Sequence, residues 1–192
     1  MTHQHKVRQL RFVRAILAAL ILAGGLYRYE NMKEANSMTS IAFDALDIGT
    51  SVSVQRTITA QDIQLFAALS GDYNPVHLDA DYASTTPFGE PIAHGMLCGA
   101  LVSAVIAMHL PGPGTIYRSQ QLKFSKPVFI GDELTITVTV EEKKARTRMV
   151  TLDCSIGNQN GAVIASGSAA VIAPDAVNTL AAAKLPAISV DG

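Results

Sequence analysis

The sequence predicts an α+β fold in which an antiparallel sheet wraps around one long helix. Three observations support this prediction. Residues 94–110 contain no Asp, Glu, Lys or Arg, four long strand patterns follow them, and shorter strand and helix patterns precede them. A helix that is apolar on every side is expected to be buried. Consecutive strands joined by short turns are expected to pair antiparallel and to cover that helix.

Length and composition limit the class of protein. The chain has 192 residues, of which 48% are hydrophobic and 16% are charged. This is enough for one core, and it excludes disordered, collagen-like and disulfide-rich chains. Cys98 and Cys154 form no CxxC pair, so we expect two buried thiols. A formal net charge of −1 argues against nucleic acid as the main partner.

The N-terminal segment, residues 1–37, differs from the rest of the chain. It has six basic and two acidic side chains, whereas the remainder has nine basic and fourteen acidic ones. Its uncharged run, 15–26, is shorter than the roughly 20 residues of a membrane span. A signal or membrane anchor, an organellar presequence, and an upstream extension of a protein that starts near Met38 all remain open. We expect the protein in the cytoplasm, with membrane contact only if this segment is an anchor.

One domain is predicted over 40–175, with a loose Ala-rich tail over 176–192. Residues 51–58 alternate like a strand, and Thr59-Ala-Gln-Asp62 is a capping-box variant that starts a helix. This helix should end at Ser70-Gly71, and Asp79 should cap another short helix. The four later strands are predicted at 115–126, 133–143, 147–157 and 162–173.

The helix predicted over 94–110 is rich in small residues, which we expect to let the sheet approach closely. These residues are Gly95, Gly99, Ala100, Ser103, Ala104 and Ala107. At about 1.5 Å per residue, the segment is slightly too short to cross a bilayer. A core helix is therefore the preferred interpretation over a membrane helix.

Asp72 and His77 are the candidate reactive residues. They flank Asn74-Pro75 in a loop between two predicted helices, and proline restricts the backbone there. A carboxylate and an imidazole on one rigid loop can hold a water molecule and exchange its protons. The spacing alone also fits an Asp that forms a turn and a structural His.

Three motifs resemble those of MaoC-like (R)-specific enoyl-CoA hydratases. They are Gly71-Asp-Tyr-Asn-Pro-Val-His-Leu-Asp79, Pro91-Ile-Ala-His-Gly-Met96 and Phe124-Ser-Lys-Pro-Val-Phe-Ile-Gly-Asp132. The resemblance covers about residues 45–172. It implies a hot-dog fold, usually as a homodimer. It also implies syn addition of water to a trans-2-enoyl thioester, which gives an (R)-3-hydroxyacyl thioester in fatty-acid metabolism.

The same resemblance implies roles for individual residues. Asp72 and His77 would be the catalytic pair, the backbone N–H of Gly95 would lie near the thioester carbonyl, and Ser103 would line the site near the Asp. A helix N-terminus suits the Gly95 role, because negative charge develops on that oxygen during hydration. His94 is expected to be a structural hydrogen-bond donor. Water addition needs no metal or redox cofactor, and CoA or acyl-carrier protein carries the substrate.

Other functions remain open at this point. The same residues would serve the reverse dehydration on CoA or acyl-carrier-protein thioesters. The hot-dog fold also hosts thioesterases and non-catalytic acyl-binding subunits, and fold alone does not separate these classes. The Asp-x4-His loop favours the hydratase over both. The acyl chain length stays open, because it depends on the depth of a pocket.

Overall fold

The computed structural model describes residues 27–28, 37–181, 183 and 186–188. The uncharged run 15–26 lies outside the described residues, and with it the expectation of a signal, anchor or presequence. Within the described part of the chain, no helix is long and apolar enough to cross a membrane.

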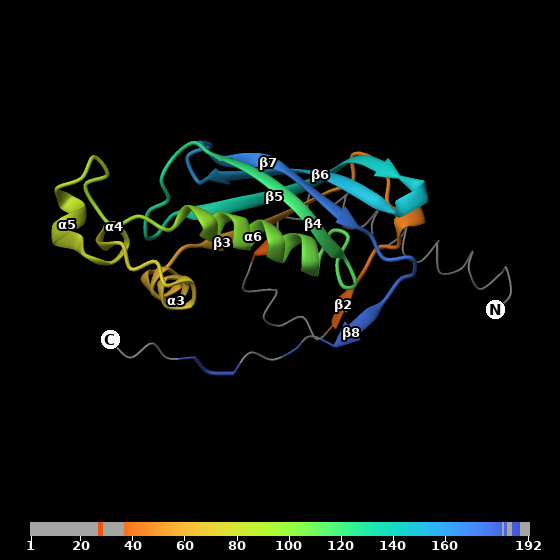
Figure 1. The fold of residues 1–192 in the computed structure, drawn as a ribbon, viewed down its shortest axis with the longest axis horizontal. Coiled ribbons are helices and arrows are strands. Elements are labelled where there is room, and N and C mark those ends of the chain that lie inside the picture. The colour runs from red at the N-terminus through yellow and green to blue at the C-terminus, as the bar shows by residue number, and fades with distance from the viewer. Residues whose placement is uncertain (1–26, 29–36, 182, 184–185, 189–192) are drawn as a thin grey trace, which may run out of the picture.

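Six strands form one curved sheet in the order β1-β3-β5-β6-β7-β4 (Figure 1). All neighbours pair antiparallel except β1 with β3, which pair parallel. The strands are β1 (Tyr27–Arg28), β3 (Ser51–Thr57), β5 (Glu133–Lys144), β6 (Met149–Asn158), β7 (Val163–Ile172) and β4 (Ile116–Phe124). The predicted strand at 51–58 and the four later strands are confirmed, with boundaries shifted by up to two residues.

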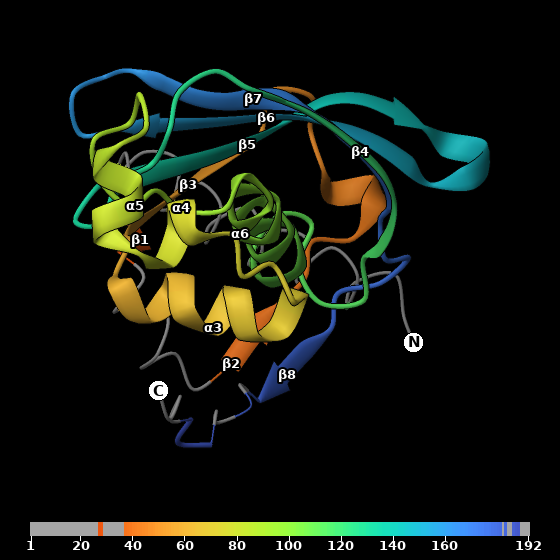
Figure 2. The ribbon, with the colours of Figure 1, turned by 60° about the vertical axis from the view of Figure 1, so that its left-hand side comes forward.

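The long helix α6 (Gly95–Met108) lies against the concave face of this sheet, and α3 (Ala60–Ser70) lies on the side of α6 that faces away from the sheet (Figure 2). The buried side chains of α6 contribute to the same core as the inward side chains of β5, such as Ile136 and Val138. The α6 side chains in this core are Cys98, Val102, Val105 and Ile106. The predicted wrapping of a sheet around a helix is confirmed.

The expectation that α6 is buried on every side is wrong. Gly95, Met96, Ala100, Ala104 and Ala107 are exposed, and Met96 is 60% exposed. The three alanines therefore do not bring the helix close to the sheet, as their small size suggested. One sheet covers one side of a helix, and α3 leaves part of the opposite side of α6 open.

Three short helices gather at one end of the molecule (Figure 1). Thr59 and Asp62 form the predicted capping box of α3, which ends at Gly71 with a φ of 75°. Asp79 caps α5 (Ala80–Ser84), as expected. The prediction that His77 lies in a loop is wrong, because residues 75–78 form the short helix α4 (Pro75–Leu78). Asn74 caps α4 and proline occupies its first position, which favours helix over loop.

Part of the tail is ordered, contrary to the expectation of a loose segment. Strand β8 (Thr179–Ala181) pairs with β2 (Ser37–Thr39). The hydroxyl of buried Ser40 accepts a hydrogen bond of 2.8 Å from the N–H of Asn178. Two 3-10 turns, η1 (Phe43–Ala45) and η2 (Ala145–Thr147), complete the fold.

Candidate active site

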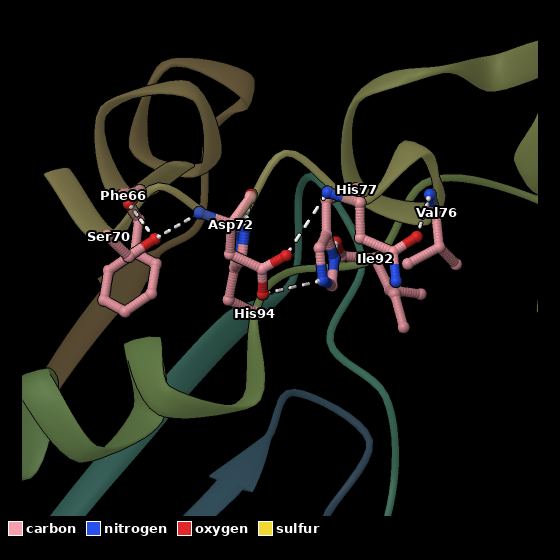
Figure 3. A network of polar contacts seen from close by, with 8 residues as sticks. Phe66, Ser70, Asp72, Val76, His77, Ile92 and His94 are labelled. Carbon is pink, nitrogen blue, oxygen red and sulfur yellow. Dashed lines mark hydrogen bonds and ion pairs between the residues drawn. The ribbon is translucent and has the colours of Figure 1, made fainter. Parts of the chain in front are cut away.

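The start of α6 meets the segment between α3 and α4 at the candidate site (Figure 3). Asp72 comes from that segment, His77 lies in α4, and His94 is the residue before α6. The carboxylate Oδ2 of Asp72 lies 3.9 Å from Nε2 of His77. The structure thus brings together the two residues that the sequence singled out, and it adds a second histidine.

Short-range hydrogen bonds hold Asp72. Its N–H donates to the hydroxyl of Ser70 over 3.3 Å, and that hydroxyl donates to the carbonyl of Phe66 over 2.7 Å. Its Oδ1 accepts from the N–H of Asn74 over 3.2 Å. Oδ2 faces His77, and the Asp72 side chain is 52% exposed, so solvent and substrate can reach the carboxylate.

His77 is held so that one ring nitrogen faces the carboxylate. Its Nδ1 lies 2.7 Å from the carbonyl oxygen of Ile92. A carbonyl only accepts, so Nδ1 carries a proton, and in the neutral form of the ring Nε2 presents its lone pair toward Asp72. The N–H of Ile92 donates to the carbonyl of Val76, which ties this segment to α4. The His77 side chain is 11% exposed.

The result is two hydrogen-bond acceptors that face each other across 3.9 Å. A carboxylate and an unprotonated nitrogen cannot bond to each other directly. One water molecule has two O–H donors, and with hydrogen bonds of about 2.8 Å it fits between acceptors separated by about 4 Å. The arrangement therefore suits the binding and deprotonation of a water molecule.

His94 completes the cluster, and its side chain is unusual for its position. It is the N-cap of α6 but makes no capping hydrogen bond. Its Nε2 instead lies 3.0 Å from the carbonyl oxygen of Asp72, and its ring stacks on His77 with centroids 3.8 Å apart. The ring of Phe66 lies 5.0 Å from that of His94.

Gly95 opens α6, next to the cluster. Its N–H lies in the first turn, where an α-helix provides no acceptor, and no side chain caps it. A Cβ at this position would lie 3.8 Å from the ring of Phe124. Ser103 lies two turns further along α6, and among the described residues no side-chain hydrogen bond joins it to Asp72.

Two residues that hold the pair were missed by the sequence reasoning. Ser70 was used only as a helix end and Asn74 only as a turn residue, yet each hydrogen-bonds to the Asp72–His77 segment. The available signal was a short polar residue two positions before and after Asp72. Such residues commonly bond to nearby backbone N–H groups.

Asp72, His77 and His94 are also the described residues that could approach a common metal ion, with one ligand atom each within 4.8 Å of the others. The His77 and His94 rings stack face to face, so the lone pairs in their ring planes do not point at one common ion. The geometry favours hydrogen bonding of a small molecule over metal ligation.

Comparison with known proteins assigns the family. Residues 45–159 match the model of the MaoC-like domain. An (R)-specific enoyl-CoA hydratase of Rhodospirillum rubrum is 46% identical over 134 residues, which span 69% of this chain and 91% of that protein. A 3-hydroxybutyryl-CoA dehydratase of Methylorubrum extorquens is 40% identical over 69% of this chain and 83% of that protein.

The solved structure of the R-hydratase PhaJ1 from Pseudomonas aeruginosa, in its unliganded form, has a similar fold. It superposes with a TM-score of 0.78 and 46% identity, covering 81% of this chain and 99% of that chain. The chain therefore belongs to the MaoC-like family and has its hot-dog fold.

Proposed function

We propose that this protein is a hydro-lyase that adds water to trans-2-enoyl-CoA and forms (R)-3-hydroxyacyl-CoA, reversibly. The observation that carries the proposal is the pair of acceptors on Asp72 and His77, fixed 3.9 Å apart by bonds to the backbone. The named hydratase and dehydratase relatives support the same chemistry. The proposed reaction belongs to acyl-CoA and fatty-acid metabolism.

The proposed reaction uses one water molecule held by the pair. The water donates one O–H to Nε2 of His77 and the other to Oδ2 of Asp72. Its oxygen bonds to C3 as the C2=C3 double bond opens, one of its protons passes to the pair, and the pair returns a proton to C2. A positioned acid–base group contributes about 10²–10⁴-fold to such a proton transfer.

The start of α6 has a separate role in this proposal. As oxygen bonds to C3, negative charge develops on the thioester oxygen. The N–H of Gly95 is uncapped and lies at the positive end of a 14-residue helix, so it is placed to stabilise that charge. Ser103 lines the substrate side of α6 in this proposal.

The proposed reaction needs no metal or redox cofactor, because water supplies both groups that add to the double bond and no electrons change hands. CoA is the proposed carrier, and acyl-carrier protein is the alternative. Hydrolysis by a hot-dog thioesterase would use water at the carbonyl carbon instead of C3. The cytoplasm remains the predicted location.

We also infer that two copies form a homodimer. Strand β4 is an edge of the six-stranded sheet, with Ile116 and Phe124 exposed on it. Met96 and the three exposed alanines give α6 an apolar face as well. A second copy would cover both surfaces, and light scattering on the purified chain would report twice the 20.3 kDa of one chain.

The test measures loss of enoyl-thioester absorbance with crotonyl-CoA, with chiral analysis of the product and a free-thiol assay. We expect (R)-3-hydroxybutyryl-CoA without thiol release. Asp72→Asn keeps the acceptor for the Asn74 N–H but replaces the acceptor that faces His77, so turnover should fall by about 10²–10⁴-fold.

Asp79→Asn is the matched control, because Asn caps a helix as well as Asp does and the Asp79 side chain bonds only to the start of α5. We expect it to keep wild-type turnover. Thiol release without hydration would assign a thioesterase, and full activity of Asp72→Asn would reject the catalytic pair.

A further inference from the structure

The second histidine of the site has contacts that the proposed reaction does not yet use. His94 is 2% exposed, and among the described residues its Nδ1 has no hydrogen-bond partner. Its Nε2 is 3.0 Å from the carbonyl oxygen of Asp72, which can only accept. Nε2 therefore carries the proton, and in the neutral ring Nδ1 is an unprotonated nitrogen.

The ring of His94 makes a second, independent contact. It stacks on His77 at 3.8 Å between centroids, with the ring planes 30° apart. His77 is otherwise held by its bond to Ile92 and by its own short helix. One face of His77 is thus fixed by His94, and Phe66 lies against His94 in turn.

The position of His94 in the helix makes these contacts informative. The residue before a helix is usually Ser, Thr, Asp or Asn, whose side chain bonds to N–H groups of the first turn. His94 makes no such bond and turns toward Asp72 and His77 instead. The first turn of α6 therefore receives no side-chain cap from its N-cap residue.

We propose that His94 is a positioning residue that holds both members of the reactive pair, Asp72 through a hydrogen bond to its carbonyl and His77 through ring stacking. The proposal rests on the proposed function, because it assigns those two residues to the reaction. Misplacement of reacting groups by about 1 Å can cost about 10²-fold in rate. His94 acts through the pair and is not required to touch substrate.

Three substitutions separate the two contacts. His94→Phe keeps a ring and removes the donor, His94→Gln keeps an N–H donor and removes the ring, and His94→Leu removes both. We expect kcat to fall by about tenfold or more in the Phe and Gln variants and by about a hundredfold in the Leu variant. KM should stay within threefold, because the substrate contacts do not change.

His109→Gln is the control, because His109 is the C-cap of α6 and lies at the end of that helix away from the site. It should keep wild-type kcat. Thermal unfolding of each variant separates loss of fold from loss of rate. Equal losses in the three His94 variants, or wild-type kcat in all of them, would overturn the proposal.

A measurement on the wild-type protein tests the same geometry without turnover. Long-range proton–nitrogen NMR should show the proton of His94 on Nε2 and that of His77 on Nδ1, with each ring assigned in the wild type by through-bond correlation to its own backbone. The opposite tautomer of His94 would overturn the proposal even if variants fail to fold. If the wild type hydrates no enoyl thioester, the proposed function fails, while the NMR result still decides the arrangement.

Discussion

The change from Gly95 to Ala separates the packing of α6 from its proposed role toward the thioester oxygen. The new Cβ would meet three ring atoms of Phe124 at 3.8 Å, which is ordinary van der Waals contact. No clash is expected, and Ala favours helix over Gly by up to about 1 kcal/mol. For a chain of this size, Tm should stay constant or rise by up to about 4 °C.

Activity should move in the opposite direction. Because the methyl group and the Phe124 ring would touch, no substrate atom fits between them. A thioester oxygen that must reach the Gly95 N–H from this side is then displaced. Loss of one such donor costs about 10²–10³-fold in kcat, so a displaced oxygen should cost at least about tenfold.

Gly99→Ala is the comparison, one turn further along α6. Its Cβ would lie 3.2 Å from Met96 Cε, the mobile end of a flexible side chain, and 3.6 Å from Leu122 Cδ1. The N–H of Gly99 lies inside the helix and is bonded within it. Crotonyl-CoA hydration should therefore stay within about threefold of wild type. Wild-type activity in Gly95→Ala, or equal losses in both variants, would refute the oxyanion role.

Two further predictions concern the core. In Gly167→Ala the Cβ would lie 1.9 Å from the backbone oxygen of Gln121 on β4, and backbone cannot move aside, so unfolding in urea should show a loss of several kcal/mol or no folded protein. Burial raises the pKa of Cys98 to about 11 and that of Cys154 to about 12, so a disulfide reagent at pH 8 should label both thiols only in denaturant. As the pH rises above about 9, the thiols of the unfolded chain lose their protons while those of the folded protein keep them, so urea titrations should show a falling free energy of unfolding. Rapid labelling of the native protein at pH 8 would contradict both the labelling and the pH prediction.

Local patterns made much of the fold predictable. The capping box at Thr59, the left-handed end at Gly71 and the period-two run of β5 each depend on residues a few positions apart. The same is true of the hydrogen bonds that Asn74 makes with Asp72 and α4, whereas His77 is also held by Ile92, 15 residues away. Such features follow from the sequence because the interactions that fix them are local.

The errors arose where distant segments decide the outcome. Burial of α6 depends on how many surfaces surround it, so an apolar helix such as this one can leave Met96 exposed. The order of β8 depends on pairing with β2, about 140 residues away in the sequence.

His94 shows why the site could be predicted only in part. Its spacing from Asp72 carries no helical or strand period, so the sequence gives no reason to join them. In the fold, the chain between α5 and α6 passes beside α4, where the backbone of Ile92 bonds to Val76 and His77. This contact brings His94 to the ring of His77, on which it stacks. The motif around His94 thus supplies two things at once, a fixed carbonyl partner for His77 at Ile92 and a ring beside it. We infer that the two sequence motifs of the site work as one unit, with the first providing the reactive groups and the second their orientation.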